Sequence, residues 1–246
     1  MGGGCQPLPA DKICWYEYVK SVMKKNVTHR CGLIKSGLVS YEVGLILQDQ
    51  AKTLIASGEW DGILILLEHL PVITVGNNGG GKENLHMTDR ELRSQGINVV
   101  STDRGGSITC HNPGQLVGYP VLHLDKWQKD VHWYVHMLEE VLIRTLAHYG
   151  LKAGRKARYT GVWLEDEKIA AIGVSVKQWV TGHGFAFNIN NNLELFHSIV
   201  PCGIREFGVT SLQHAGVKAA LDDVAAIIAE EFAGLFNCIL TRGAIA

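Results

Sequence analysis

The apolar and polar positions of the chain follow a helical period in three segments. From Glu42, "EVGLILQDQAKTLIAS" places Val43, Ile46, Leu47, Ala51, Leu54 and Ile55 on one stripe, and Gly58 follows where a helix would end. A longer helix is predicted over 130–149, with Asp130 as its N-cap and Gly150 as its terminator. A last amphipathic helix is predicted over about 219–236, and a weaker one around 88–95.

Short apolar runs between turn-forming residues predict strands. "GILILLEHLPVITVG" (62–76) indicates two buried strands interrupted near Pro71. Further strands are predicted within 98–124, in the hairpin "GVWLEDEKIAAIGVSV" (161–176) around an acidic turn at 165–167, and in "GHGFAFNIN" (182–190). Runs of strands with helices at the two ends and in the middle favour an α/β protein of the α+β kind, in which helices flank a mixed sheet.

The composition changes this picture little. The 246 residues are 46% hydrophobic, the formal net charge is -1, and no apolar run approaches the roughly 20 residues that span a bilayer. We therefore expect a soluble protein that has neither a nucleic acid nor a membrane as partner. We predict one domain over 31–246, preceded by an N-terminal extension, 1–30, to which we assign no role.

The six cysteines are scattered, and the first 30 residues contain neither a signal-peptide core nor an Arg/Ser-rich leader. A reducing compartment fits best, because the spacing is not that of a disulfide scaffold. The cytoplasm is the expected location, and a mitochondrial or plastid matrix is the alternative.

Two motifs point to cofactors but lack an essential residue. "GNNGGGKE" (76–83) approaches a phosphate-binding loop, yet Glu83 stands where magnesium coordination requires a hydroxyl. His132 and His136 have the i,i+4 spacing of zinc ligands, but the intervening general-base glutamate of a metalloprotease is absent. We predict no cofactor and no metal.

The candidate chemistry lies in a thiol, a lysine and a glycine-rich loop. Cys202 stands between Pro201 and Gly203, and it would become a nucleophile if a nearby ammonium favoured its thiolate; inert packing is the alternative. Lys168 begins an apolar strand and is the candidate for that ammonium, although a solvated lysine fits the same pattern. "RGGSITCHNPGQ" (104–115) would let a backbone approach a ligand closely, or would form only a tight turn.

Taken together, these segments resemble the lipoyl(octanoyl) transferases. The resemblance covers roughly 32–213 and is carried by "RGGSITCHNPGQ", "KIAAIG" (168–173), "HGFAFN" (183–188), "VPCGI" (200–204) and "VTSL" (209–212), in the order of that family. It implies a fold similar to the catalytic domain of biotin and lipoate protein ligases. It also implies an enzyme, an acyltransferase that moves an octanoyl group from acyl carrier protein to a lysine of lipoyl domains, in the E2 subunits of 2-oxoacid dehydrogenases and in the glycine-cleavage H protein.

The resemblance assigns roles to individual residues. Cys202 matches the nucleophile that carries the acyl group as a thioester, and Lys168 matches the acid/base lysine. The positions that match the acyl-binding segments are Arg104, Gly105, Gly106, Ser107, Ile108, Thr109, Cys110, His111, Ala171, Ile172, Gly173, Gly184, Phe185 and Ala186. We expect Ile108, Ile172 and Phe185 to form walls of an apolar slot.

Two positions depart from the family pattern. Cys110 replaces an aromatic residue and is predicted to widen the slot, and Asn112 replaces a glycine whose positive φ an asparagine can adopt. Acyl chain length is therefore the property that the resemblance predicts least. The rival interpretations are an ATP-dependent lipoate or biotin protein ligase on the same fold, and a non-catalytic module that binds lipoyl domains or acyl carriers.

Overall fold

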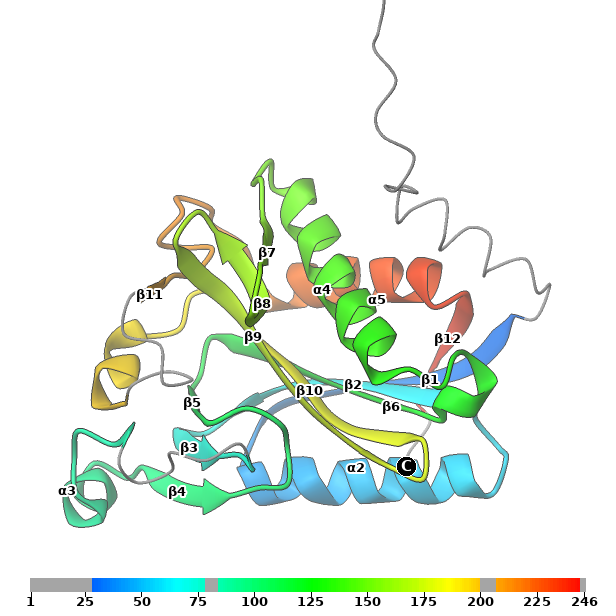
Figure 1. Cartoon of the computed structure of the whole chain (residues 1–246), viewed down its shortest axis with the longest axis horizontal. Coiled ribbons are helices and arrows are strands. Elements are labelled where there is room, and N and C mark those ends of the chain that lie inside the picture. Colours follow the sequence, from blue (N-terminus) through cyan, green and yellow to red (C-terminus); the bar gives the residue numbers. More distant parts are fainter. Residues whose placement is uncertain (1–27, 78–83, 200–206, 244–246) are drawn as a thin grey trace, which may run out of the picture.

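A mixed sheet of nine strands forms the centre of the protein (Figure 1). The computed structural model describes residues 28–77, 84–199 and 207–243. The strand order is β12-β1-β2-β6-β10-β9-β8-β7, with β11 beside β9. The bounds are β1 His29–Val39, β2 Gly62–His69, β6 Gln115–Leu122, β7 Gly154–Lys156, β8 Tyr159–Leu164, β9 Glu167–Lys177, β10 Val180–Asn188, β11 Gly208–Val209 and β12 Cys238–Arg242.

Helix α2 (Tyr41–Ala56) connects β1 to β2 and covers one face of this sheet (Figure 1). Because β1 and β2 are parallel, the chain needs such a crossover, and Ser40 begins the helix by accepting a hydrogen bond from the backbone N–H of Val43. The predicted helix is confirmed, but its predicted face is wrong at Val43 and Ile46, whose side chains are 40% and 56% exposed.

The true buried face of α2 is set by its close approach to the sheet. The buried residues of this helix are Tyr41, Gly44, Gln48, Ala51 and Ile55. A Cβ on Gly44 would come within 2.7 Å of the His69 ring, so the glycine lets the helix lie directly on the sheet. Gln48 is buried because its side-chain oxygen accepts a hydrogen bond from the backbone of His183 at 2.7 Å. Apolar periodicity alone does not predict the contact of Gly44 or the hydrogen bond of Gln48.

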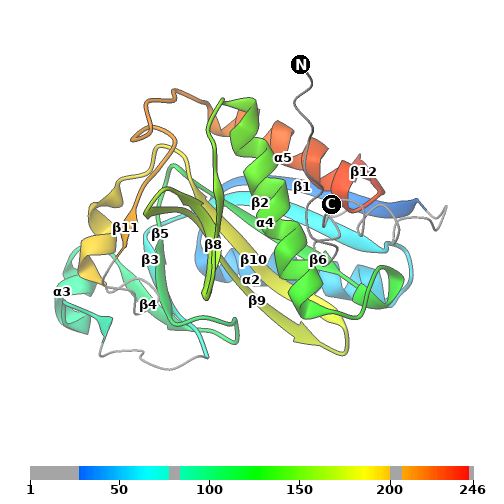
Figure 2. The same ribbon diagram turned by 45° about the horizontal axis from the view of Figure 1, so that its top comes forward.

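Helices α4 (Val131–His148) and α5 (Leu221–Leu235) cover the opposite face of the sheet (Figure 2). Both confirm predicted helices, and Asp130 is the N-cap of α4, since its carboxylate accepts from the N–H groups of His132 and Trp133. The side chains between these helices and the sheet form the largest apolar cluster, which includes Tyr134, Leu138, Phe187, Ile228 and Phe232. The sheet is therefore buried on both faces.

A second sheet of three strands stands at one end of the molecule, in the order β4-β3-β5 (Figure 1). Its strands are β3 (Val72–Val75), β4 (Asn98–Ser101) and β5 (Ile108–His111), and α3 (Asp89–Ser94) precedes β4. The predicted interruption near Pro71 is the point where the chain passes from the large sheet to the small one. The predicted short helix is confirmed and begins with a capping box formed by Thr88 and Glu91.

The remaining elements are short 3-10 turns at Leu124–Lys126 and Leu193–Ser198. The hairpin of β8 and β9 is confirmed, although its turn is shorter than predicted because Glu167 already belongs to β9. The mixed α/β fold is likewise confirmed, whereas β1, β7, β11 and β12 were not predicted. In the described part of the chain, no helix is long and apolar enough to cross a membrane.

Candidate active site

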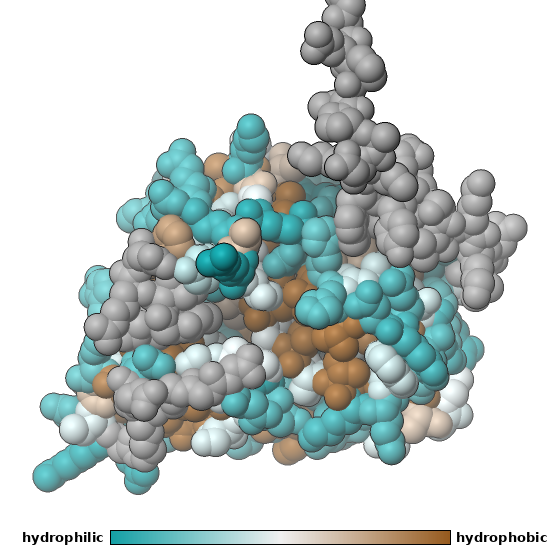
Figure 3. All heavy atoms as spheres, in the orientation of Figure 1, coloured by the Kyte–Doolittle hydropathy of each residue, from teal (hydrophilic) through white to brown (hydrophobic). Residues whose placement is uncertain are grey.

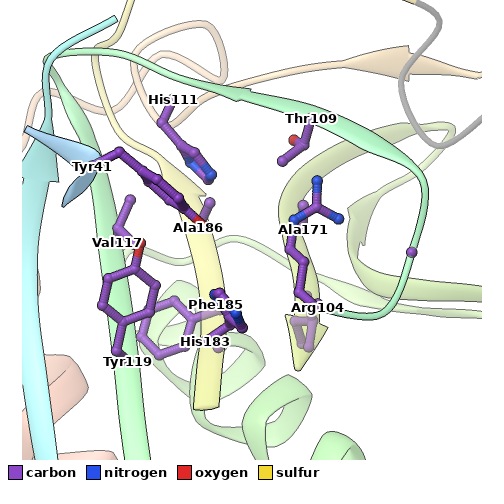
Figure 4. Close-up of a pocket in the computed structure, with 14 residues that line it drawn as sticks. Tyr41, Arg104, Thr109, His111, Val117, Tyr119, Ala171, His183, Phe185 and Ala186 are labelled. Carbon is purple, nitrogen blue, oxygen red and sulfur yellow. The ribbon is translucent and has the colours of Figure 1, made fainter. Parts of the chain in front are cut away.

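A pocket lies between the large sheet and the small one (Figure 4). It encloses about 460 Å³ of empty space, including its open mouth. Its lining residues are Tyr41, Arg104, Gly106, Thr109, His111, Val117, Tyr119, Ala171, Ile172, Gly173, His183, Gly184, Phe185 and Ala186. The half-buried members are Gly106 and the three β9 residues, so the pocket opens along β9 and closes toward Tyr41 and Tyr119.

Arg104 attaches the loop before β5 to both sheets. Its guanidinium donates to the backbone oxygen of Thr74 at 2.7 Å and to the Thr74 hydroxyl at 2.8 Å. The next residue, Gly105, donates its N–H to the carbonyl of Val174 in β9 at 2.8 Å. A Cβ on Gly173 would lie 2.8 Å from the Gly105 carbonyl, so this loop forms a close roof over the pocket.

Neutral aromatic and histidine rings form the closed end. Tyr119 donates its hydroxyl hydrogen to His69 Nε2 at 2.7 Å, because His69 Nδ1–H donates to the carbonyl of Val39 at 3.2 Å. Tyr41 stacks on His111 with ring centroids 6.2 Å apart. Burial lowers the pKa of His69 to about 4 and the pKa of His111 to about 3, so both rings are uncharged at neutral pH.

The stability of the protein is expected to fall in mild acid because of these histidines. The pKa of His69 is near 6.5 in an unfolded chain and about 4 here, so the unfolded state binds more protons as the pH falls below 6.5. This residue alone should lower the free energy of unfolding by about 2 kcal/mol between pH 7 and pH 5. Urea unfolding of the wild type and of His69→Gln at both pH values measures the effect. Equal pH dependence of the two proteins would contradict it.

His183 also lines the pocket; its backbone has φ 56°, and its ring packs edge-on against Tyr119 with ring centroids 6.3 Å apart. His183 Nε2 lies 2.8 Å from Asp103 Oδ1, and Lys177 Nζ lies 2.7 Å from Asp103 Oδ2. These partners, Lys177 first, lower the pKa of Asp103 to about 2. An exposed ion pair therefore fixes a buried ring of the pocket from outside.

A chain of hydrogen bonds joins the pocket to the strand that carries Lys168. His111 Nδ1–H donates to Gln115 Oε1 at 2.7 Å, and Gln115 Nε2 donates to Asn188 Oδ1 at 2.9 Å. Asn188 Nδ2 donates to the carbonyl of Thr210 at 3.0 Å, and the N–H of Thr210 donates to the carbonyl of Lys168 at 3.1 Å. Four segments that are far apart in the sequence thus meet beside the pocket.

Lys168 is buried to 8% exposure at the beginning of β9. Its ammonium donates to the carbonyl of Thr160 at 3.1 Å and lies 4.9 Å from the centre of the Trp163 ring. Phe207 packs edge-on against Tyr159 and Trp163, at 5.4 Å from each. The chain that resumes at Phe207 is therefore held beside Lys168, and β11 continues parallel to β9 with Val209 opposite Lys168.

Comparison with known proteins is specific. A family model described as "Lipoyl protein ligase A/B catalytic domain" matches residues 40–233. Octanoyltransferases of Thermoanaerobacter pseudethanolicus and Clostridium kluyveri are each 48% identical over 205 residues, covering 83% of this chain and 90% and 88% of theirs. The chain belongs to the lipoyl protein ligase A/B catalytic-domain family.

Solved structures of lipoate protein ligases have the same fold. A lipoate-protein ligase A bound with ATP superposes with a TM-score of 0.72 at 16% identity, over 89% of this chain and 90% of that one. A putative lipoate protein ligase from T. acidophilum with bound lipoic acid gives 0.71, also at 16% identity and the same coverage. The resemblance predicted from the sequence, and with it an acyltransferase enzyme, is confirmed.

Most of the residues that were predicted to bind substrate line the pocket. They are Arg104, Gly106, Thr109, His111, Ala171, Ile172, Gly173, Gly184, Phe185 and Ala186. Gly105, Ser107, Ile108 and Cys110 do not line it. Because residues of β5 alternate between two faces, Ile108 and Cys110 point instead into a separate apolar cluster with Ile73 and Phe196.

The two departures from the family pattern act differently from what was predicted. Cys110 is fully buried outside the pocket, and burial raises the pKa of its thiol well above its usual range, so it neither widens the pocket nor offers a thiolate there. Asn112 does not have the positive φ that was predicted for it, because the turn is made instead by Gly114, with φ 90°. The Asn112 side chain instead donates to the carbonyl of Asn192 at 2.7 Å.

Cys202 and the "VPCGI" motif lie outside the described residues. So do residues 78–83 of the "GNNGGGKE" segment and residues 1–27 of the predicted extension. The described chain ends at Ile199, which bridges to Leu85, and resumes at Phe207. In the described part, no group of histidine, cysteine and carboxylate side chains could hold a metal ion.

Sequence reasoning missed Tyr41, Val117, Tyr119 and His183 as pocket residues. The signal for two of them was present in the sequence, because Val117 and Tyr119 are two positions apart in β6 and therefore project from the same face of the strand. Tyr41 precedes the apolar stripe that was predicted to be buried, and no pattern within that helix identifies it.

Proposed function

We propose that the chain transfers an octanoyl group from the thioester of an acyl carrier protein to a lysine of a lipoyl domain, through an acyl thioester on Cys202. The observation that carries this proposal is the pocket, which we call the acyl slot. It is lined by small and apolar side chains at Val117, Ala171, Ile172 and Ala186, and it opens on β9, the strand that contains Lys168.

The lining of the slot suits a medium-length acyl chain. Burial of a methylene contributes about 0.8 kcal/mol, so some six methylenes contribute roughly 5 kcal/mol. Polar side chains that line the slot have hydrogen-bond partners within the protein: Arg104 bonds to Thr74, Tyr119 to His69, His111 to Gln115 and His183 to Asp103. An uncharged, largely apolar ligand therefore meets few unpaired groups there.

The chemistry proceeds in two exchanges. In the first, the Cys202 thiolate attacks the carrier thioester, a new carbon–sulfur bond forms, the bond from the carrier sulfur to the acyl carbon breaks, and the carrier leaves as a thiol with a proton from the Lys168 ammonium. In the second, the amine of the acceptor lysine attacks octanoyl-Cys202, the amide forms, and the thiolate is released. The attacking amine must first lose a proton, and we propose that Lys168, left neutral by the first exchange, accepts it.

The geometry of the described residues supports a meeting of Cys202 and Lys168. Cys202 is five residues before Phe207, whose ring packs beside Trp163, so an extended connection spans at most about 18 Å. Trp163 in turn contacts the Lys168 ammonium. An ammonium near a thiol stabilises the thiolate that the first step requires.

The acceptors we propose are lipoyl domains of E2 subunits and the H protein, and the location is the cytoplasm. Relatives named octanoyltransferase come from bacteria, and the family model includes lipoyl ligases. Because a thioester already holds the energy for amide formation, the reaction requires neither ATP nor a metal.

A direct transfer assay tests the proposal. The full chain is incubated with octanoyl-acyl carrier protein and a lipoyl domain without ATP, and the domain is analysed by intact mass. We expect a gain of one octanoyl group on the domain. Modification only from free octanoate and ATP would instead identify a ligase, and binding without modification would identify a non-catalytic module.

A further inference from the structure

The floor of the acyl slot consists of small residues on β9 and β10, and it ends at larger residues on β6. The register pairs Ala171 of β9 with Ala186 of β10, and Ala186 with Val117 of β6. Paired residues face the same side of a sheet, so these three side chains form one row across the slot. A neighbouring row begins with Gly173 of β9 and Gly184 of β10, which are also paired.

The large residues stand together on β6. Val117 and Tyr119 are two positions apart and therefore project from the same face of that strand. Figure 4 shows Tyr41, Val117 and Tyr119 together on one side of the slot, Ala171 on the other side, and Ala186 between them. The side chains thus change from glycine and alanine on β9 and β10 to valine and tyrosine on β6.

This end of the slot is rigid. Val117 is 1% exposed, and Tyr41 and Tyr119 are each 3% exposed. The hydrogen bond from the Tyr119 hydroxyl to His69, 2.7 Å long, fixes the tyrosine ring, and His69 is itself fixed by the carbonyl of Val39. A longer ligand cannot move this wall without breaking buried hydrogen bonds.

The width of the floor corresponds to eight carbons. Adjacent strands are about 4.8 Å apart, so the row from Ala171 to Val117 crosses about 10 Å. An extended octanoyl chain measures roughly 9 Å from its carbonyl carbon to its methyl carbon, since each bond of about 1.5 Å advances a zigzag chain by about 1.25 Å. A carbonyl carbon at the β9 mouth therefore places the terminal methyl group against Val117.

We propose that Val117, held between Tyr41 and Tyr119, determines acyl chain length in this protein, with the acyl chain lying across β9 and β10 toward β6. This inference rests on the proposed octanoyl transfer and goes beyond it, because it assigns the length limit to one side chain. It also moves the determinant away from Cys110, which lies outside the slot.

Chain-length profiles of variants test the assignment. Transfer is measured as kcat/KM with hexanoyl, octanoyl, decanoyl and dodecanoyl carrier thioesters. Val117→Ala opens space for one to two methylenes and is expected to raise the decanoyl-to-octanoyl ratio by roughly ten-fold, because each buried methylene is worth about four-fold. Ala186→Val obstructs the floor one strand nearer the mouth and should favour hexanoyl over octanoyl.

The matched control is Val121→Ala, the same substitution on the same strand. Val121 is fully buried in the cluster that also contains Val117, but it does not line the slot. It should lose similar stability and keep the wild-type profile. The same profile for Val117→Ala as for Val121→Ala would overturn the assignment.

The wild type provides a test that does not depend on folding of the variants. We expect its kcat/KM to rise from hexanoyl to octanoyl and to fall at decanoyl and dodecanoyl. A flat profile from octanoyl to dodecanoyl would overturn the length limit while leaving octanoyl transfer intact. Absence of transfer from every thioester would instead overturn the proposed function.

Discussion

Replacement of Cys202 by serine is expected to reduce octanoyl transfer by on the order of 1,000-fold or more. A thiolate exchanges readily with a thioester, whereas a serine hydroxyl remains protonated at neutral pH and is a much weaker nucleophile. The wild type should gain the mass of one octanoyl group when mixed with octanoyl-acyl carrier protein alone. Cys202→Ser should gain none during the same interval.

Cys110→Ser is the control for this experiment. Its thiol is fully buried among Ile73, Leu92 and Phe196, and its raised pKa keeps it protonated. We expect this variant to form the acyl adduct and to transfer it, because Cys110 does not line the slot. Transfer at the wild-type rate by Cys202→Ser, or loss of the adduct only in Cys110→Ser, would show that Cys202 is not the residue that carries the acyl group.

Substitution of Lys168 by arginine is expected to reduce complete transfer by about 100-fold to 10,000-fold. Arginine keeps a positive charge beside the thiolate but does not accept a proton, because its guanidinium stays protonated in proteins. The acyl adduct on Cys202 should therefore still form and should persist when the lipoyl domain is added. Quenched-flow mass spectrometry separates these two steps.

Lys168→Met removes the charge as well and should slow both steps. The methylene groups of Lys168 pack next to Gly161, so methionine keeps most of that contact. If Lys168→Arg passed its acyl group to the acceptor as fast as the wild type, Lys168 would not be the proton acceptor. If Lys168→Met acylated Cys202 at the wild-type rate, its charge would not be needed for the first step.

The sequence predicted the mixed fold, the main helices and the family correctly, because these depend on periodicity and on motifs that are local. It predicted the acyl-binding segments as continuous blocks, and here the structure divides them. In β5, Thr109 and His111 face the slot while Ile108 and Cys110 face away. A strand pattern fixes the alternation, but only the pairing of that strand decides which set faces the ligand.

The closed end of the slot was beyond prediction for a related reason. Tyr41, His69, His111 and Tyr119 come from four different elements, and Tyr41 reaches the rings of His69 and His111 because α2 lies directly on the sheet at Gly44. The face of α2 that is buried follows from that contact and from the hydrogen bond of Gln48, so Val43 and Ile46 remain exposed.

Apolar side chains also gather on the face of the molecule that Figure 3 shows, near the β9–β10 hairpin and the start of α4.

The parallel pairing of β1 with β12 has a consequence for synthesis of the chain. Strand β1 is complete at Val39, but its outer partner begins only at Cys238. At the usual elongation rate of about 5–20 residues per second, the ribosome needs roughly 10–40 s to produce the intervening segment. During that time one edge of β1 has no strand to pair with, and such an edge can pair with another nascent chain. The last described strand therefore closes the edge that the first described strand leaves open.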